Sequence, residues 1–308
     1  MKKVLVAGSE GFIGKNLVCE LLKRNYAVYG ISKRQKPETI HSDYHYTSMD
    51  VLDRKKVDNL FRQGPFDSVI YLASITAYQQ VSKDKEPALQ LNTTGLINFL
   101  ENVAKNPQTK FVFASNGKVY GKAEKLPLSE DQRPNPINIF GKIKWVAEKL
   151  IDLYSHQSRN RFIILRIFNV YGPGQGIDFL VPTILSQLTE GKGEVTLGNI
   201  YDRRDYIYID DVVSAIELLL EHELPPGLNI FNVGNGQSFS AYDIVKTIEK
   251  IVCEKIMIKT DQSKIRKDEP ANEYADIDKL LSLGWSPHYD LKAGLEKTMS
   301  CLNLQILN

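Results

Sequence analysis

Cysteine, tryptophan and methionine are scarce in this chain of 308 residues, which has three, two and four of them. The cysteines (Cys19, Cys253 and Cys301) are far apart and odd in number, which excludes a disulfide framework and a cysteine-rich metal cluster. We expect no bound metal. Isolated thiols of this kind are typical of a reducing compartment, so a cytoplasmic location is expected.

An excess of charge of either sign is also missing, because 39 basic residues face 37 acidic ones. The formal net charge of +2 gives no reason to expect a nucleic-acid partner. No apolar run approaches the ~20 residues of a membrane-spanning helix, so no membrane partner is expected. Met1 is followed at once by a strand-like run, which predicts that no signal peptide precedes the fold.

Short apolar runs alternate with amphipathic stretches over the first half of the chain. The runs predict strands at residues 4–7, 27–31, 68–72, 111–114 and 162–167, and the amphipathic stretches predict helices at residues 13–23, 89–104 and 140–154. Buried parallel strands have continuous apolar sequences, and strands that alternate with helices predict a parallel sheet. The expected fold is therefore of the α/β class, with a doubly wound parallel sheet.

A glycine-rich loop of sequence GSEGFIG, residues 8–14, joins the first expected strand to the first expected helix. Gly8 permits the tight turn, Gly11 lets the backbone approach a pyrophosphate, and Gly14 allows close packing of helix against strand. The helix start then presents free N–H groups and a partial positive charge to the phosphates. The loop in this context predicts a Rossmann-like dinucleotide site.

The end of the second expected strand decides between NAD and NADP in such a fold. An acidic residue there would accept a hydrogen bond from the ribose 2′-OH, but this chain has Ser32, Lys33 and Arg34. With no carboxylate to repel it and two cations nearby, a 2′-phosphate is favoured. We expect NADP in preference to NAD; the alternative is that the two cations are a solvated surface pair.

The chain changes character after the last of these strands. From residue 171 onward, short strands and helices are mixed with charged loops. We therefore expect a dinucleotide-binding domain over residues 1–170 and a smaller substrate-binding lobe over residues 171–308. The apolar run at residues 228–233 could return to the large sheet.

Further segments extend the pattern over nearly the whole chain: residues 49–51, 72–74, 92–95, 119–121, 166–174, 204–211 and 283–285. With the glycine loop, they make the chain similar to the extended short-chain dehydrogenases/reductases of the nucleotide-sugar epimerase/dehydratase type. The resemblance implies an NAD(P)-dependent enzyme that acts on a nucleoside-diphosphate sugar. It also implies a homodimer formed through the helices expected at residues 89–104 and 140–154.

The resemblance assigns roles to individual residues. The cofactor would be bound by Gly8, Gly11, Phe12, Ile13, Gly14, Ser32, Lys33, Arg34, Asp50, Val51, Leu72, Ala73, Ser74 and Lys144. The substrate would be bound by Tyr78, Asn116, Asn169 and Arg204, of which Arg204 would hold the diphosphate. A planar guanidinium suits a pair of phosphates. The alternative for Arg204 is a salt bridge to Asp205 or Asp210.

The reaction centre departs from the family pattern at two of its three positions. The family has a Ser or Thr where this chain has Asn116, and a Tyr where it has Phe140, but Lys144 is present. A Tyr four residues before a Lys shares its helix face, where the ammonium lowers the phenol's pKa. Phe140 cannot donate a proton, whereas Asn116 can hydrogen-bond a sugar oxygen through either end of its amide.

Three explanations for the altered centre are open. Tyr120, Tyr78, Lys118 or a bound water could serve as the acid/base. A tyrosine could have been replaced deliberately to trap a substrate. The protein could instead have lost its activity and act as a nucleotide-sugar sensor or partner subunit.

The expected function is redox chemistry at C4 of the sugar, with ketoreduction favoured over epimerisation because NADP is expected.

Overall fold

The computed structural model describes residues 1–122, 125–190, 193–265 and 269–302, apart from the side chains of Tyr78 and Gln79. The chain forms two compact units. The first contains residues 1–119, 139–166 and 213–231, and the second contains residues 120–138, 167–212 and 232–308.

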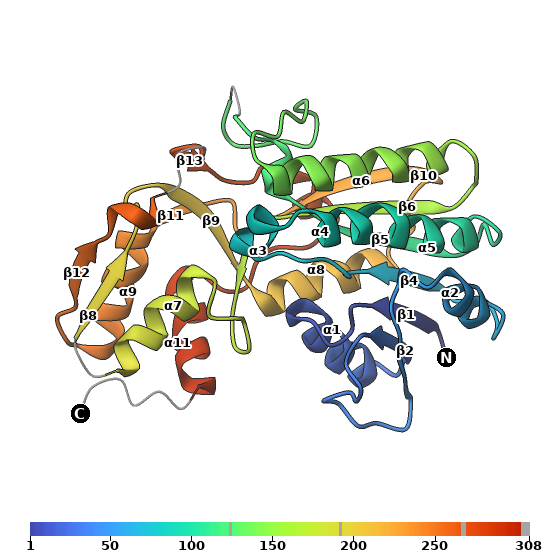
Figure 1. Ribbon diagram of the computed structural model, residues 1–308, viewed down its shortest axis with the longest axis horizontal. Coiled ribbons are helices and arrows are strands. Elements are labelled where there is room, and N and C mark those ends of the chain that lie inside the picture. The colour runs from blue at the N-terminus through green and yellow to red at the C-terminus, as the bar shows by residue number, and fades with distance from the viewer. Residues whose placement is uncertain (123–124, 191–192, 266–268, 303–308) are drawn as a thin grey trace. The chain divides into compact units, whose positions relative to one another are not determined.

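The first unit contains a seven-stranded sheet in the order β10-β6-β5-β4-β1-β2-β3 (Figure 1). In this order the strands are β10 (Gly227–Val233), β6 (Arg161–Ile167), β5 (Lys110–Asn116), β4 (Ser68–Tyr71), β1 (Lys3–Ala7), β2 (Ala27–Ser32) and β3 (Tyr44–Ser48). Strand β1 pairs in parallel with both β2 and β4. The direction of the winding reverses beside β1, and ligands of doubly wound sheets bind at this switch point.

Helices cover both faces of this sheet (Figure 1). α2 (Arg54–Phe61), α5 (Leu96–Val103) and α6 (Ile139–Ser155) pack on one face, against a core that includes Leu5 and Ala7 of β1. α1 (Phe12–Lys23) and α8 (Ile209–Glu221) lie on the other face, where an ion pair of 3.0 Å joins Arg24 to Glu217. Successive residues of β1 are buried because both faces are covered.

The helix expected at residues 89–104 is present but is not a regular α-helix. It consists of α4 (Glu86–Gln90), the π-helical turn η1 (Leu91–Gly95) and α5. Side chains bond back to carbonyls four residues earlier, Asn92 to Ala88 at 2.8 Å and Thr93 to Leu89 at 2.8 Å, and Tyr71 donates to the Leu91 carbonyl. Such competing bonds favour a wider turn.

The second unit is built around β9 (Arg203–Tyr208), which pairs with β7 (Asn169–Tyr171), β11 (Ser238–Ser240) and β13 (Asn272–Glu273). A separate parallel pair joins β8 (Glu194–Leu197) to β12 (Met257–Thr260). The helices of this unit are α7 (Leu180–Thr189), α9 (Ala241–Val252), α10 (Asp278–Ser282) and α11 (Leu291–Cys301). The other helical segments among the described residues are α3 (Tyr78–Lys83), η2 (Gly117–Val119) and η3 (Gln262–Lys264).

The sequence predicted one boundary near residue 170 and a possible return of residues 228–233 to the large sheet. The two compact units are each made of several segments, and the division into a dinucleotide-binding domain and a substrate-binding lobe stays a prediction. Most of α8 and of β10 joins the first unit, because β10 forms the edge of its sheet beside β6. Residues 120–138 join the second unit, where backbone bonds tie Leu128 to Tyr274 and Asp276. None of the helices described here is long and apolar enough to cross a membrane.

Candidate cofactor and substrate sites

The glycine loop after β1 leaves no room for side chains on its inner side. Gly8 has a φ of +86°, and a Cβ at this position would lie 2.9 Å from the backbone nitrogen of Ala73. A Cβ at Gly14 would lie 2.1 Å from the carbonyl oxygen of Gly8. The loop is therefore a narrow cradle of main chain at the switch point of the sheet.

The N-terminus of α1 faces this cradle with its own backbone donors. Gly11 is the N-cap residue, and no side chain in the described part of the chain caps the helix. The N–H groups of a first helical turn lack partners within the helix and attract anions. The cradle and the helix start together fit the pyrophosphate of a dinucleotide.

Asp50 and Val51, which the resemblance assigns to the cofactor, lie in a segment that is fixed by hydrogen bonds. Asp50 Oδ1 accepts from the Leu52 N–H at 3.0 Å, and the buried Asn98 donates to the Val51 carbonyl at 3.0 Å. Lys33 pairs with Asp50 at 2.7 Å. Burial raises the pKa of Asp50, but the bonds from Lys33 and Leu52 outweigh it and leave the pKa below its usual value.

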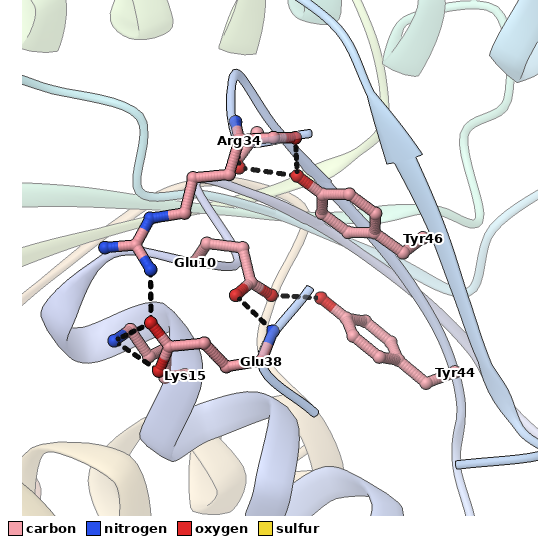
Figure 2. A network of polar contacts seen from close by, with 7 residues as sticks. Glu10, Lys15, Arg34, Glu38, Tyr44 and Tyr46 are labelled. Carbon is pink, nitrogen blue, oxygen red and sulfur yellow. Dashed lines mark hydrogen bonds and ion pairs between the residues drawn. The ribbon is translucent and has the colours of Figure 1, made fainter. Parts of the chain in front are cut away.

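Arg34, the second cation of the predicted NADP site, is also paired. Its guanidinium donates to Glu38, whose carboxylate also accepts from Lys15 Nζ at 2.7 Å (Figure 2). Both cations at the end of β2 thus already have a carboxylate partner.

The segment after β4, Leu72-Ala73-Ser74, runs directly beside the cradle. The Leu72 N–H donates to the Ala7 carbonyl at 2.8 Å, and Asn92 donates to Ser74 Oγ at 3.1 Å. These contacts fix the segment against the end of β1 and against η1.

Lys144 is buried in α6 with 3% of its surface exposed. Its Nζ donates to the Ala114 carbonyl at 2.7 Å and lies 4.7 Å from the centre of the Phe113 ring. Burial lowers the pKa of Lys144 to about 7, although the charge of Glu148 opposes the shift. An ammonium in this position can lose its proton near neutral pH.

Glu148, one turn after Lys144, is engaged elsewhere. It accepts from Ser115 Oγ and pairs with Arg166 at 2.9 Å, and all three residues are buried. Glu148 therefore offers Lys144 a nearby negative charge while its own oxygens are bonded to other groups.

Asn116 ends β5, and the two ends of its amide differ. Oδ1 accepts from the Lys118 N–H at 2.8 Å, which closes a turn at η2. Nδ2 is buried and has no hydrogen-bond partner among the residues that the structure describes. A buried donor without a partner is costly unless a ligand supplies an acceptor. Asn116 can thus donate to a ligand oxygen but has its own oxygen engaged.

Phe140 lies one turn before Lys144 on α6 and is half-buried. It packs against a small apolar cluster that includes Val81, Ala88 and Ile143. The ring is thus held by packing, and nothing in its structural role requires a hydroxyl.

In the second unit, Arg204 is buried with 7% of its surface exposed. Neither Asp205 nor Asp210, the partners considered from the sequence, pairs with it; instead Arg204 meets Glu269 at 2.7 Å, Glu273 at 3.4 Å and Asp202 at 3.6 Å. A phosphate that binds Arg204 must therefore compete with carboxylates.

Asp205, the residue after Arg204, binds backbone N–H groups of two other segments of the second unit. It is fully buried, and its carboxylate accepts from the N–H groups of Asn235, Gly236 and Ala275 at 2.7, 3.0 and 3.1 Å. Burial raises the pKa of Asp205 to about 7, and the three backbone bonds oppose the rise. The predicted substrate residue Asn169 donates to the Asp205 carbonyl at 2.9 Å.

Tyr120 is 2% exposed, and its hydroxyl donates to Asn232 Oδ1 at 2.7 Å. Its ring lies 6.5 Å from that of Phe168. This geometry is that of a packed ring within the second unit. The side chain of Tyr78, the other candidate tyrosine, lies outside the described part of the structure.

Sequence reasoning missed several residues of these sites. Glu10 lies within the glycine loop but was given no role, Glu38 comes from the loop after β2, and Glu148 lies one turn after Lys144 on α6. The only local signals were the place of Glu10 in the glycine loop and the spacing of Glu148, four residues after Lys144. In the described part of the chain, no cluster of three His, Cys, Asp or Glu residues is placed to hold a metal.

The sequence model of the NAD-dependent epimerase/dehydratase family matches residues 4–234 of this chain. The chain is 30% identical over 306 residues to the putative UDP-glucose 4-epimerase of Methanocaldococcus jannaschii, covering 96% of this chain and 97% of the relative. It is also 30% identical over 312 residues to the dTDP-4-dehydro-6-deoxyglucose reductase of Escherichia coli, covering 97% of each.

Among solved structures, the chain is similar to the UDP-glucuronic acid 4-epimerase of Bacillus cereus in complex with UDP-glucuronic acid and NAD. The TM-score is 0.88 with 30% identity, and the match covers 98% of this chain and 99% of that one.

Proposed function

Because the chain belongs to the NAD-dependent epimerase/dehydratase family, we propose that it is an enzyme that uses a nicotinamide dinucleotide to carry out redox chemistry at C4 of a nucleoside-diphosphate sugar. The relatives support this, because they include a putative 4-epimerase and a reductase of a 4-dehydro sugar. A reductase and epimerases share hydride transfer at one carbon of the sugar.

The observation that carries the proposal is the main-chain cradle at the switch point, closed by Gly8 and Gly14 and followed by the uncapped start of α1. Lys144 would hold the nicotinamide ribose, and the dinucleotide would supply the hydride. The test is binding: the purified chain should retain a nicotinamide dinucleotide, identified by mass spectrometry, or gain thermal stability when one is added. If it does neither, the proposal fails.

The proton that accompanies the hydride needs a donor other than Phe140. We assign this role to Lys144, whose buried ammonium titrates near pH 7. Its proton reaches the substrate through a bound water, which occupies the place of the missing phenol. Asn116 Nδ2, which has no partner in the described structure, donates a hydrogen bond to the same C4 oxygen. The hydroxyl of Tyr120 is engaged by Asn232, which argues against its taking this part.

Net ketoreduction is the direction we propose for the reaction. A side chain that only donates hydrogen bonds stabilises the negative charge that develops on a carbonyl oxygen as hydride arrives. The reductase of a 4-dehydro sugar among the relatives supports this direction. The preference for NADP that the sequence predicted stays a prediction, because Lys33 and Arg34 are both paired.

Arg204 is proposed to bind the diphosphate of the substrate. We predict that Arg204→Lys raises KM for the nucleotide sugar about 10- to 100-fold with a smaller change in kcat, because an ammonium lacks the two-pronged geometry that matches phosphate. Steady-state kinetics measure both constants. The matched control is Arg203→Lys, because its neighbour Arg203 is exposed and pairs with Asp243. Equal KM values for the two variants would remove Arg204 from the site.

A homodimer is proposed through the helices named from the resemblance. Apolar side chains are exposed along them, Val146 by 43% and Leu153 by 53% on α6 and Leu89 by 39% on α4. We predict that Leu153→Glu weakens self-association and leaves the secondary structure of the monomer intact, because its side chain is exposed in the monomer. Sedimentation velocity checks this, and a wild-type protein that sediments as a monomer would refute it.

A nucleotide-sugar sensor or partner subunit is the alternative function, and Phe140 with Asn116 is the observation that favours it. Such a protein would bind a nucleotide sugar but would turn over no member of a panel of nucleoside-diphosphate 4-keto sugars.

A further inference from the structure

The loop after β2 returns to the glycine loop and is fastened to it by a buried acid. Glu10, in the glycine loop, is 4% exposed. Its Oε2 accepts from the backbone N–H of Glu38 at 2.9 Å, and its Oε1 accepts from the hydroxyl of Tyr44 at 2.9 Å (Figure 2). The main chain at residue 38 is therefore fixed beside the pyrophosphate cradle.

A second set of bonds fixes the same loop from the side of β3. The hydroxyl of Tyr46 lies 2.8 Å from Ser32 Oγ and donates to the Arg34 carbonyl at 2.5 Å. The Arg34 N–H in turn donates to Ser32 Oγ at 3.1 Å. The conformation of residues 32–38 is thus set by the protein itself.

These bonds place the Glu38 carboxylate between two cations. Both of its oxygens lie 2.7 Å from Nζ of Lys15, which follows Gly14 directly, and it also accepts from Arg34 (Figure 2). The bonds from Lys15 and Arg34 lower the pKa of Glu38, so it is ionised at neutral pH. The cations that could bind a 2′-phosphate already hold an anion.

We propose that Glu38 selects the cofactor: it supplies from the loop the acidic group that is missing at the end of β2, so that the site accepts the 2′-OH of NAD and rejects the 2′-phosphate of NADP. The inference rests on the proposed function, because it requires a dinucleotide on the glycine loop. A carboxylate accepts a hydrogen bond from a ribose hydroxyl, whereas it repels a phosphate. A preference for NAD is the opposite of the preference for NADP that the sequence predicts from Ser32, Lys33 and Arg34.

The test compares the affinities for NAD⁺ and NADP⁺ by isothermal titration calorimetry on the full chain. The wild type should bind NAD⁺ more tightly. Glu38→Gln should shift the ratio of the two dissociation constants toward NADP⁺ by about 10- to 100-fold, because Lys15 and Arg34 are then free to bind phosphate. Adding Arg34→Ala to Glu38→Gln should remove most of this gain.

Glu86→Gln is the matched control, because Glu86 is an exposed residue of α4 that bonds Gln90. It should leave the ratio unchanged. Tighter NADP⁺ binding by the wild type, or the same ratio in wild type and Glu38→Gln, would overturn this inference and leave the proposed function standing. If neither nucleotide binds to folded wild type or variants, both fail.

Discussion

Phe140→Tyr is expected to raise kcat for reduction of a nucleoside-diphosphate 4-keto sugar by about 10²- to 10⁴-fold, the usual contribution of a positioned acid/base. The new phenol would lie one turn before Lys144 on the same face of α6, where the ammonium lowers the phenol's pKa. The ring position is already held by Val81, Ala88 and Ile143, so the substitution adds one hydroxyl to an existing ring.

The measurement is kcat with saturating cofactor, with Phe140→Leu as the control because it changes the packing without adding a hydroxyl. Dissociation constants for the dinucleotide should be the same in all three proteins within about twofold, since Phe140 is not proposed to bind it. Equal kcat values for wild type and Phe140→Tyr would show that another group already donates the proton efficiently. No activity in either protein would favour the sensor.

Lys144→Met is expected to lower kcat by at least about 10²-fold and to weaken dinucleotide binding about 10- to 100-fold, because it removes both the titrating group and a charged donor to the ribose. Lys144→Arg separates the two roles. Its guanidinium keeps the charge but does not release a proton near pH 7, so it should recover binding more than kcat. Recovery of kcat by Lys144→Arg would contradict the assignment of the proton to Lys144.

The pH dependence of stability gives a second readout of Lys144 that needs no substrate. The folded protein loses the Lys144 proton near pH 7, whereas the unfolded chain keeps it up to about pH 10.4. Between these values the unfolded state binds the extra proton, so a rise in pH favours folding by up to about 1.4 kcal/mol per pH unit.

Urea denaturation from pH 7 to 9 should therefore show the free energy of unfolding of the wild type rising relative to that of Lys144→Met. Other titrating groups contribute to both proteins and cancel in the difference. If the free energies of unfolding of the two proteins changed with pH in parallel over this range, the pKa of Lys144 in the folded protein would be close to its ordinary value.

Much of the fold follows from local sequence. The strands and helices around the glycine loop are where the apolar runs and periodicity place them, since a buried strand and an amphipathic helix each need only their own pattern. The edge strand β3 and the helix α2 were missed. β3 is short and polar, and only Tyr44 in it is buried; α2 has only Val57 and Leu60 buried.

The candidate sites also combine features that the sequence predicts with features that only the fold determines. The sequence alone identified the glycine loop and the family of the chain, because a motif is a local property. The replacement of the family's two hydroxyl residues by Asn116 and Phe140 stays a prediction. The division into units depended on where residues 120–138 and β10 find hydrogen-bond partners, which lie more than 60 residues away along the chain.

Only the tertiary structure decided which polar groups are free to act. The sequence left Asn116 able to bond through either end; in the fold its oxygen accepts from Lys118, whereas its buried Nδ2 has no partner among the described residues. The sequence favoured a 2′-phosphate beside Lys33 and Arg34, whereas the fold brings Glu38 to Arg34 and Lys15 to the same carboxylate. Residue type sets what a group can donate or accept, but burial and partners distant in the chain determine whether it is available to a ligand.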